Sequence, residues 1–175
     1  MKVGHPFKIA KHGSDEYYTP AYAIEPLKKY IKPNSKIWCP FDIEKSHFVK
    51  EFRKEGHEVI YTHIDYGEDF FDIDIDCDYI ISNPPYSRKF EVIERLFELG
   101  KPFAMLVGVV GLFDSKNKLN LFKDKEFEIM YMSPRVNYFK DYDNPIEIKG
   151  IPYQSVYLCS KVLPKQIVFE EINKR

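Results

Sequence analysis

The sequence is poor in cysteine and has no long apolar run. Its three cysteines stand alone, with no CxxC spacing, so neither a disulfide framework nor a zinc site is indicated. Reduced, buried thiols fit this pattern best. No apolar stretch reaches the roughly 20 residues that a membrane helix needs, and the amino terminus has no signal-peptide core. These absences predict a cytoplasmic protein with no membrane partner and no metal.

An excess of one charge is also missing. The sequence has 26 lysines and arginines and 27 aspartates and glutamates, which gives a net charge of −1. This balance excludes a uniformly basic surface for nucleic acid. The average hides an acidic block, because residues 65–78 contain seven acids and no base while both flanks are net positive. The ordinary interpretation of this block is an exposed acidic loop. Any nucleic-acid-binding surface must therefore be a local basic patch.

What the sequence does contain is 44% hydrophobic residues, enough to bury a core. We predict one domain over residues 15–175, after a flexible polar amino terminus over residues 1–14. Strands and helices alternate, which predicts an α/β fold with a mostly parallel sheet covered by helices. The predicted strands are 36–41, 58–64, 77–82, 102–110, 127–132, 155–160 and 166–169, and the predicted helices are 20–31, 47–55, 90–99 and 119–125.

The sharpest feature is the turn Asn83-Pro84-Pro85-Tyr86, directly after the third predicted strand. Ligands of open α/β sheets bind beyond the carboxyl ends of the strands. The two prolines stiffen the backbone and remove N–H donors but leave their carbonyls as acceptors. The Asn83 side-chain oxygen and the Pro84 carbonyl would thus form an acceptor pair for a planar amine, with Tyr86 stacking on its ring. The same residues also suit a plain strand-terminating turn.

This turn resembles the NPPY signature of N6-adenine DNA methyltransferases, with the closest overall similarity to small phage-encoded enzymes. The resemblance covers about residues 15–161. It implies a Rossmann-like methyltransferase domain with a seven-stranded, mostly parallel sheet, helices on both faces and 155–160 as the antiparallel closing strand. It further implies S-adenosylmethionine as cofactor, adenine in DNA as acceptor, and the host cytoplasm as location if the protein is phage-encoded. The implied catalytic residues are Asn83, Pro84, Pro85 and Tyr86.

The resemblance also implies a set of cofactor residues. The segment Tyr18-Thr19-Pro20 is similar to the family's Y-x-T-P element, and Cys39-Pro40-Phe41 resembles its D-P-F first motif. Asp65, after the second predicted strand, matches the acid that binds the cofactor's ribose hydroxyls in the family. Asp69-Phe70 resembles the pair that holds the cofactor's adenine, by a hydrogen bond and by packing respectively. The residues so implied are Tyr18, Thr19, Pro20, Pro40, Phe41, Asp65, Asp69 and Phe70. Asp42, which directly follows the first motif, is a further candidate for the cofactor site.

The sequence leaves two questions open. The family's glycine-rich turn is replaced by residues 42–46, which contain no glycine, so side chains there would crowd a ligand approaching the backbone. Either Asp42 and Glu44 hold the cofactor in another way, or the chain is a non-catalytic binding protein on a methyltransferase scaffold. The acceptor is a second question, since RNA or a protein glutamine also presents a planar nitrogen.

Basic residues near the turn and beyond residue 111 are candidates for nucleic-acid contacts. An ordinary charged surface explains those beyond residue 111 equally well, whereas the pair directly after the turn is better placed to meet phosphates. The target sequence and the choice between a monomer and a homodimer stay open. The candidate residues for DNA, or RNA, are Arg88, Lys89, Lys116, Lys118 and Arg135.

Overall fold

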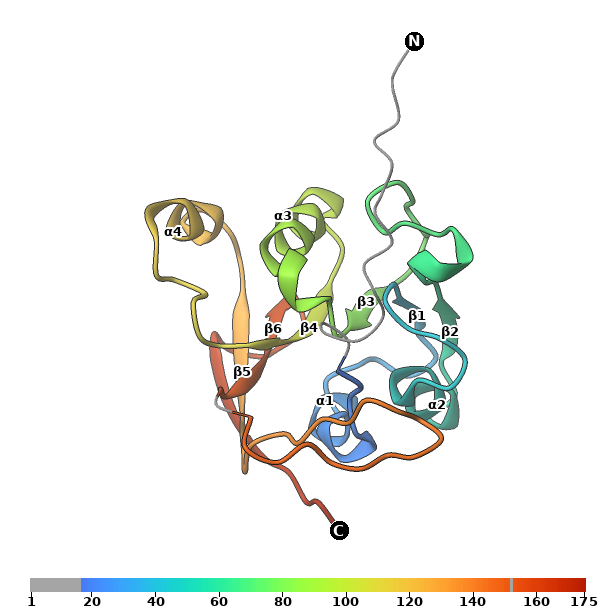
Figure 1. Ribbon diagram of the computed structural model, residues 1–175. Coiled ribbons are helices and arrows are strands. Elements are labelled where there is room, and N and C mark those ends of the chain that lie inside the picture. Colours follow the sequence, from blue (N-terminus) through green and yellow to red (C-terminus); the bar gives the residue numbers. More distant parts are fainter. Residues whose placement is uncertain (1–16, 152) are drawn as a thin grey trace.

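The computed structural model describes residues 17–151 and 153–175. The expected flexible segment 1–14 lies outside these residues. A seven-stranded sheet with the order β2-β1-β3-β4-β6-β5-β7 forms the centre (Figure 1). The strands are β1 (Lys36–Cys39), β2 (Glu58–Tyr61), β3 (Tyr79–Ser82), β4 (Phe103–Gly108), β5 (Glu128–Ser133), β6 (Ser155–Ser160) and β7 (Ile167–Glu171).

Strand β6 runs antiparallel to both of its neighbours, β4 and β5, and every other neighbouring pair in the sheet is parallel. This confirms the predicted α/β fold, including the antiparallel strand at 155–160. The helical segments are η1 (Ala21–Ala23), α1 (Glu25–Lys28), α2 (His47–Lys54), η2 (Ile64–Tyr66), η3 (Tyr86–Arg88), α3 (Lys89–Leu99) and α4 (Lys116–Phe122).

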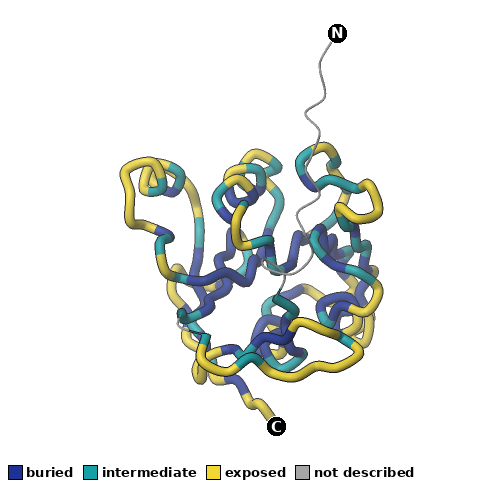
Figure 2. Tube along the Cα trace, viewed as in Figure 1, coloured by how far each residue is buried: buried dark blue, intermediate teal, exposed yellow. Residues whose placement is uncertain are grey.

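The helices cover both faces of the sheet, with α1 and α2 on one side and α3 and α4 on the other (Figure 1). Strand β4 is buried along its whole length, and its side chains alternate between the two faces. Ala104 and Leu106 join the core beneath α1 and α2, while Phe103 and Met105 join the core beneath α3 and α4. Figure 2 accordingly shows the buried residues concentrated along the sheet.

Three elements begin or end away from the predicted positions. The helix predicted over 20–31 is the 3-10 turn η1 followed by the short α1, which places Pro26 in its first turn. Proline fits a first turn but cannot continue a helix that approaches it. Helix α4 starts before the predicted residue 119, because Ser115 caps it by accepting a hydrogen bond from the Lys118 N–H at 3.4 Å. Strand β2 stops at Tyr61, before η2. No helix among the described residues is long and apolar enough to span a membrane.

The acidic block crosses the α3 side of the sheet between η2 and β3. Over residues 71–78 its side chains alternate strictly between half-buried and exposed, as in an extended strand lying on an apolar surface. This confirms that Asp72, Asp74 and Asp76 are exposed to solvent, and Asp74 forms an ion pair with Lys101. The half-buried residues are Phe71, Ile73, Ile75 and Cys77, all packed against the core beneath α3 and α4.

Phe70 anchors this segment to the core, and its loss should be costly. Its side chain is 2% exposed and its ring lies 5.4 Å from that of Trp38 and 5.1 Å from that of Phe41. We predict that Phe70→Ala lowers the free energy of unfolding by about 3–5 kcal/mol, measured by urea denaturation. Phe169→Ala is the control, because Phe169 is 77% exposed, and a loss there as large as at Phe70 would contradict the assignment of Phe70 to the core.

Candidate active site

The carboxyl ends of β1 and β3 meet at one edge of the sheet, and the chain from Tyr17 to Pro20 crosses this edge. Asp42 follows β1, and Asn83 follows β3 directly. Thr19 hydrogen-bonds to Asn83, and Ser82 hydrogen-bonds to Asp42. The structure therefore brings together three of the segments that the sequence singled out, although they are far apart along the chain.

The side-chain amide of Asn83 is held from one side. Its Nδ2 donates to the Tyr17 carbonyl oxygen at 2.9 Å and to Thr19 Oγ1 at 3.3 Å. No described residue donates a hydrogen bond to Asn83 Oδ1 or to the carbonyl oxygen of the buried Pro84. The Pro85 carbonyl, in contrast, accepts the Arg88 N–H at 3.2 Å as η3 begins. The turn thus keeps two adjacent acceptors, one from a side chain and one from the backbone.

The crossing segment is clamped by the chain after β5. Tyr18 pairs with Phe139 in an isolated antiparallel bridge, with its N–H 2.8 Å from the Phe139 carbonyl oxygen. The Tyr18 ring stacks on Tyr142, with centroids 4.2 Å apart. The Thr19 carbonyl oxygen lies 2.9 Å from Nδ1 of His47, at the start of α2. Pro20, also buried, precedes η1, so the whole segment is fixed from both sides.

Asp42 is a buried carboxyl group beside the turn. It is 6% exposed, and Ser82 Oγ donates to its Oδ2 at 2.5 Å. Burial raises the pKa of Asp42 to about 6, and hydrogen bonds from Ser82 and Ser46 offset part of that rise. Ser46 Oγ in turn lies 3.2 Å from the hydroxyl of Tyr142. A chain of polar contacts therefore links the loop after β5 to the residue that precedes Asn83.

In the glycine-free loop 42–46, the two charged side chains that follow Asp42 form ion pairs. Glu44 forms an ion pair with Arg53 at 2.6 Å, and Lys45 forms one with Asp143 at 2.7 Å. Ser46 closes the loop, because its Oγ accepts the Ile43 N–H at 3.0 Å. Glu44 and Lys45 accordingly already have charged partners, whereas Asp42 is held by a serine hydroxyl.

The remaining implied cofactor residues differ in how accessible they are. Asp65 lies in η2, is exposed, and has its carboxylate 3.5 Å from His63 Nδ1. Asp69 uses Oδ1 to accept the Phe71 N–H at 3.0 Å. Phe41 is half-buried, whereas Phe70 belongs to the core behind it. Pro40 is buried, and its carbonyl oxygen is 3.5 Å from Thr62 Oγ1. Asp65 is therefore exposed, Phe41 and Asp69 are half-buried, and Pro40 and Phe70 are buried.

Tyr86 presents an aromatic surface next to the turn. It is 53% exposed, and its ring lies 6.0 Å from that of Tyr153, with an interplanar angle of 28°. The Tyr153 ring covers Gly108, where a Cβ atom would come within 3.1 Å of it. Sequence reasoning missed Tyr153, which lies outside every strand and helix predicted above. Its place two residues before the predicted strand 155–160 was the one available signal.

The basic candidates are placed very differently from one another. Lys89 is buried, and its ammonium group donates to the carbonyl oxygens of Gly108 and Val110, both at 3.2 Å. Burial, together with the charge of Lys118, lowers the pKa of Lys89. Lys89 is therefore turned inward and not presented to a phosphate. Arg88 pairs with Glu91 at 2.7 Å and lies over the Phe71 ring.

The other basic candidates lie farther along the chain. Lys118 pairs with Asp114 at 2.7 Å, and Lys116 and Arg135 are exposed. Among residues 17–151 and 153–175 there is no group of three or more histidines, cysteines, aspartates or glutamates placed to hold a metal.

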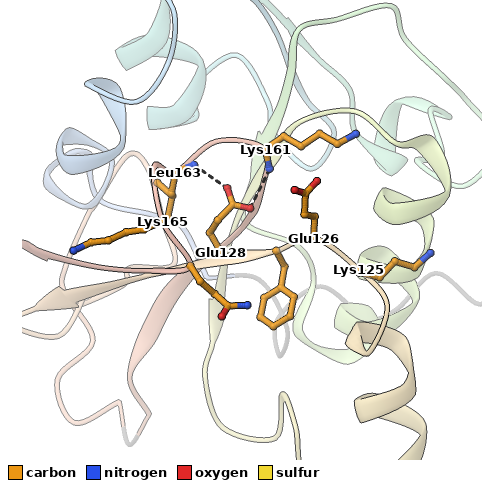
Figure 3. A pocket seen from close by; sticks show the side chains of 8 residues that line it. Lys125, Glu126, Glu128, Lys161, Leu163 and Lys165 are labelled. Atoms are coloured by element: carbon orange, nitrogen blue, oxygen red, sulfur yellow. Dashed lines mark hydrogen bonds between the residues drawn. The ribbon is translucent and has the colours of Figure 1, made fainter.

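A cavity of about 350 Å³ lies near the start of β5, at the opposite edge of the sheet (Figure 3). Its lining includes Glu128, whose carboxylate accepts the N–H groups of Lys161, Val162 and Leu163 at 2.8–3.1 Å. These hydrogen bonds fix the chain where it leaves β6. The cavity is therefore remote from the turn at Asn83, and its buried carboxylate already has partners.

Comparison with known proteins supports the fold. No protein-family model and no curated protein matches the sequence. Among solved structures, the chain is similar to the modification subunit of a putative type I restriction enzyme from Vibrio vulnificus YJ016, with a TM-score of 0.51 and 11% identity over 94% of this chain. The chain spans about half of that structure, 49% of its length. Together with the strand order, this similarity shows a Rossmann-like methyltransferase fold.

The buried carboxyl of Asp42 predicts a pH-dependent stability. Because its pKa is higher in the folded protein than its ordinary value of 3.8, folding favours the protonated form, and stability falls as pH rises through about 6. We predict that Asp42→Asn, which cannot ionise, is more stable than the wild type at pH 8, by up to about 3 kcal/mol at roughly 1.4 kcal/mol per pKa unit. This advantage should shrink to about 0.5 kcal/mol at pH 4, where the carboxyl group is protonated in the folded protein and partly protonated in the unfolded chain.

Urea denaturation at the two pH values measures this difference. Asp72→Asn serves as the control, because Asp72 is exposed and its replacement should change stability by less than about 0.5 kcal/mol. An Asp42→Asn variant that differs from the wild type by the same amount at pH 4 and pH 8 would show that Asp42 does not titrate abnormally.

Proposed function

We propose that this chain is an S-adenosylmethionine-dependent methyltransferase that methylates N6 of adenine in DNA. The observation that carries the proposal is a pair of acceptors, Asn83 Oδ1 and the Pro84 carbonyl oxygen, that receive no hydrogen bond from residues 17–151 and 153–175 and lie at the carboxyl edge of a methyltransferase-like sheet. Two adjacent acceptors match the two N–H bonds of an exocyclic amino group. The similar solved structure is described as the modification subunit of a putative type I restriction enzyme, which favours DNA as the acceptor.

The residues around the turn fit a bound S-adenosylmethionine. The exposed carboxylate of Asp65 suits the ribose hydroxyls, and the half-buried ring of Phe41 offers packing for the adenine. Asp42 is buried beside the turn, and its carboxyl group is largely ionised at neutral pH, given its pKa of about 6. It would complement the ammonium group of the methionine portion through its negative charge rather than through a hydrogen bond. Phe70 supports Phe41 from the core, at a ring distance of 5.1 Å.

When bound, S-adenosylmethionine would supply a methyl group to the lone pair of the acceptor nitrogen. The electrons of the broken methyl–sulfur bond would stay on sulfur, and the nitrogen would release a proton. The amino nitrogen of adenine is a poor nucleophile, because its lone pair is delocalised into the ring. By accepting both N–H bonds, Asn83 and Pro84 draw this nitrogen toward tetrahedral geometry and localise the lone pair. Orientation of this kind is worth about 7–11 kcal/mol in favourable systems.

Tyr86 supplies the surface on which the target base stacks. In a duplex the adenine has to leave the helix first, which costs a few kcal/mol, and stacking on an aromatic ring offsets part of that cost. Tyr86 is more than half exposed next to Pro85, and Tyr153 lies beside it. Arg88, next to the turn, and the exposed Lys116 and Arg135 are then the side chains available to contact phosphates. Lys89 is excluded because it is buried.

Replacement of Asn83 should separate catalysis from cofactor binding. We predict that wild-type protein binds S-adenosylmethionine in calorimetric titration, and that Asn83→Ala binds it equally well but transfers methyl groups to DNA at least about 100-fold more slowly, the scale of removing one preorganised polar group. Asn117→Ala, at an exposed position on α4, is the matched control and should match the wild type in both assays.

The outcomes of this experiment discriminate between the alternatives. No binding heat and no thermal shift at millimolar cofactor would overturn the proposal and favour a non-catalytic binding protein. Binding without transfer to DNA, but with transfer to RNA or to a protein glutamine, would correct the acceptor. Loss of both binding and transfer in a folded Asn83→Ala variant would contradict the role assigned to Asn83.

The stacking role of Tyr86 gives a separate prediction. Tyr86→Phe keeps the ring and should bind adenine-containing oligonucleotides as the wild type does. Tyr86→Ala should bind them about 5- to 150-fold more weakly, because base–aromatic stacking contributes about 1–3 kcal/mol. Fluorescence anisotropy with a labelled oligonucleotide measures this difference. Equal affinities for the phenylalanine and alanine variants would show that the Tyr86 ring does not contact the base.

A further inference from the structure

We infer that Thr19 is a positioning residue whose hydroxyl, together with the Tyr17 carbonyl, fixes the rotation of the Asn83 amide so that Oδ1 faces the acceptor nitrogen. This inference rests on the proposed function for its effect on the rate. It departs from the role that the sequence resemblance implies for Thr19, a contact with the cofactor. The two roles predict different consequences when the hydroxyl is removed.

The orientation of the Asn83 amide follows from its partners. A carbonyl oxygen has no proton to donate, so the atom that faces the Tyr17 carbonyl at 2.9 Å must be the donor Nδ2. A rotation of the amide by half a turn would place Oδ1 against that carbonyl and leave two acceptors facing each other without a hydrogen. The second hydrogen on Nδ2 is taken by Thr19 Oγ1 at 3.3 Å.

The Thr19 side chain has no other evident task. The residue is 3% exposed, and Asn83 is the one hydrogen-bond partner of its hydroxyl within the part of the chain that the structure describes. A buried hydroxyl that already serves Asn83 has little surface left for a bound ligand. Thr19 therefore acts on Asn83 rather than on the cofactor.

Both acceptors are themselves held in place. The Thr19 carbonyl oxygen contacts His47 Nδ1 at 2.9 Å, and the bridge between Tyr18 and Phe139 lies between the two acceptor residues. The Tyr17 ring packs edge-on against Tyr138, with centroids 6.1 Å apart. A side chain held by fixed partners needs no reorganisation when substrate binds, which is the condition for an effective oriented acceptor.

The rotation matters because a turned amide would repel the substrate. With Nδ2 in place of Oδ1, the N–H groups of Asn83 would meet the N–H groups of the acceptor, and the lone pair of the nitrogen would stay delocalised. Loss of the Thr19 hydroxyl loosens this choice of rotamer but leaves the Tyr17 carbonyl in place. The expected effect is therefore on kcat, and it is moderate.

The test uses Thr19→Val, which keeps the shape of the side chain, Thr19→Ser, which keeps its hydroxyl, and the control Tyr157→Phe. Tyr157 donates a buried hydrogen bond to the Ala23 carbonyl at 3.0 Å, so its replacement also removes a buried hydroxyl that ties down the amino-terminal part of the chain. Three quantities are measured: kcat for methyl transfer, the Kd for S-adenosylmethionine, and hydrogen exchange of the Asn83 side-chain NH₂ by NMR, assigned with Asn83→Ala.

We expect Thr19→Val to lower kcat by about three- to tenfold, the range for one hydrogen bond, with an unchanged Kd and faster exchange of the Asn83 amide protons. Thr19→Ser should restore both, and Tyr157→Phe should change neither. A weaker cofactor affinity with unchanged amide exchange would overturn the inference, because it would make Thr19 a cofactor contact.

The exchange measurement keeps this test independent of the proposed function. If the wild type transfers no methyl group, the proposed function fails, while faster amide exchange in Thr19→Val still supports the positioning role and equal exchange overturns it. If Thr19→Val does not fold, the amide exchange rate of Asn83 in the wild-type protein tests the inference. Asn83 amide protons that exchange more slowly than those of the exposed Asn117 support the inference, and equally fast exchange contradicts it.

Discussion

The hydrogen bond from Asn83 Nδ2 to the Tyr17 carbonyl oxygen is the contact on which the candidate site depends. It joins the turn after β3 to a segment that comes before the first strand, and that segment is held by the chain after β5 through the bridge between Tyr18 and Phe139. Three distant parts of the sequence thus meet at one edge of the sheet. Because the bond engages the donor side of the amide, it leaves the acceptor side of Asn83 available beside the Pro84 carbonyl.

The polar groups behind this contact form a rigid support. Asp42, Ser82 and Ser46 satisfy one another away from solvent, and Tyr142 extends the network to the loop after β5. Buried polar groups are tolerated when each has a partner, and a satisfied network fixes a single arrangement. The network also explains how a loop without glycine lies beside the turn, since its charged side chains pair with residues elsewhere and its buried carboxyl is held by serines.

Much of the fold and part of the site could be predicted from the sequence. The alternation of apolar strands and amphipathic helices is a local signal, and so is the pair of prolines after β3. The direction in which a side chain points is not local. Phe70 and Lys89 were expected to face ligands, yet Phe70 packs on Trp38 and Lys89 binds the carbonyl oxygens of Gly108 and Val110. Such placements depend on residues distant in sequence, as does the stacking of Tyr153 on Tyr86.

The central claim is that the two open acceptors serve methyl transfer to adenine. The most direct measurement is mass spectrometry of nucleosides from DNA incubated with the wild-type protein and S-adenosylmethionine that carries a deuterated methyl group. We predict N6-methyldeoxyadenosine that carries the deuterated methyl group, at a level that rises with enzyme concentration. A folded protein that binds the cofactor but leaves every DNA nucleoside unlabelled would contradict it.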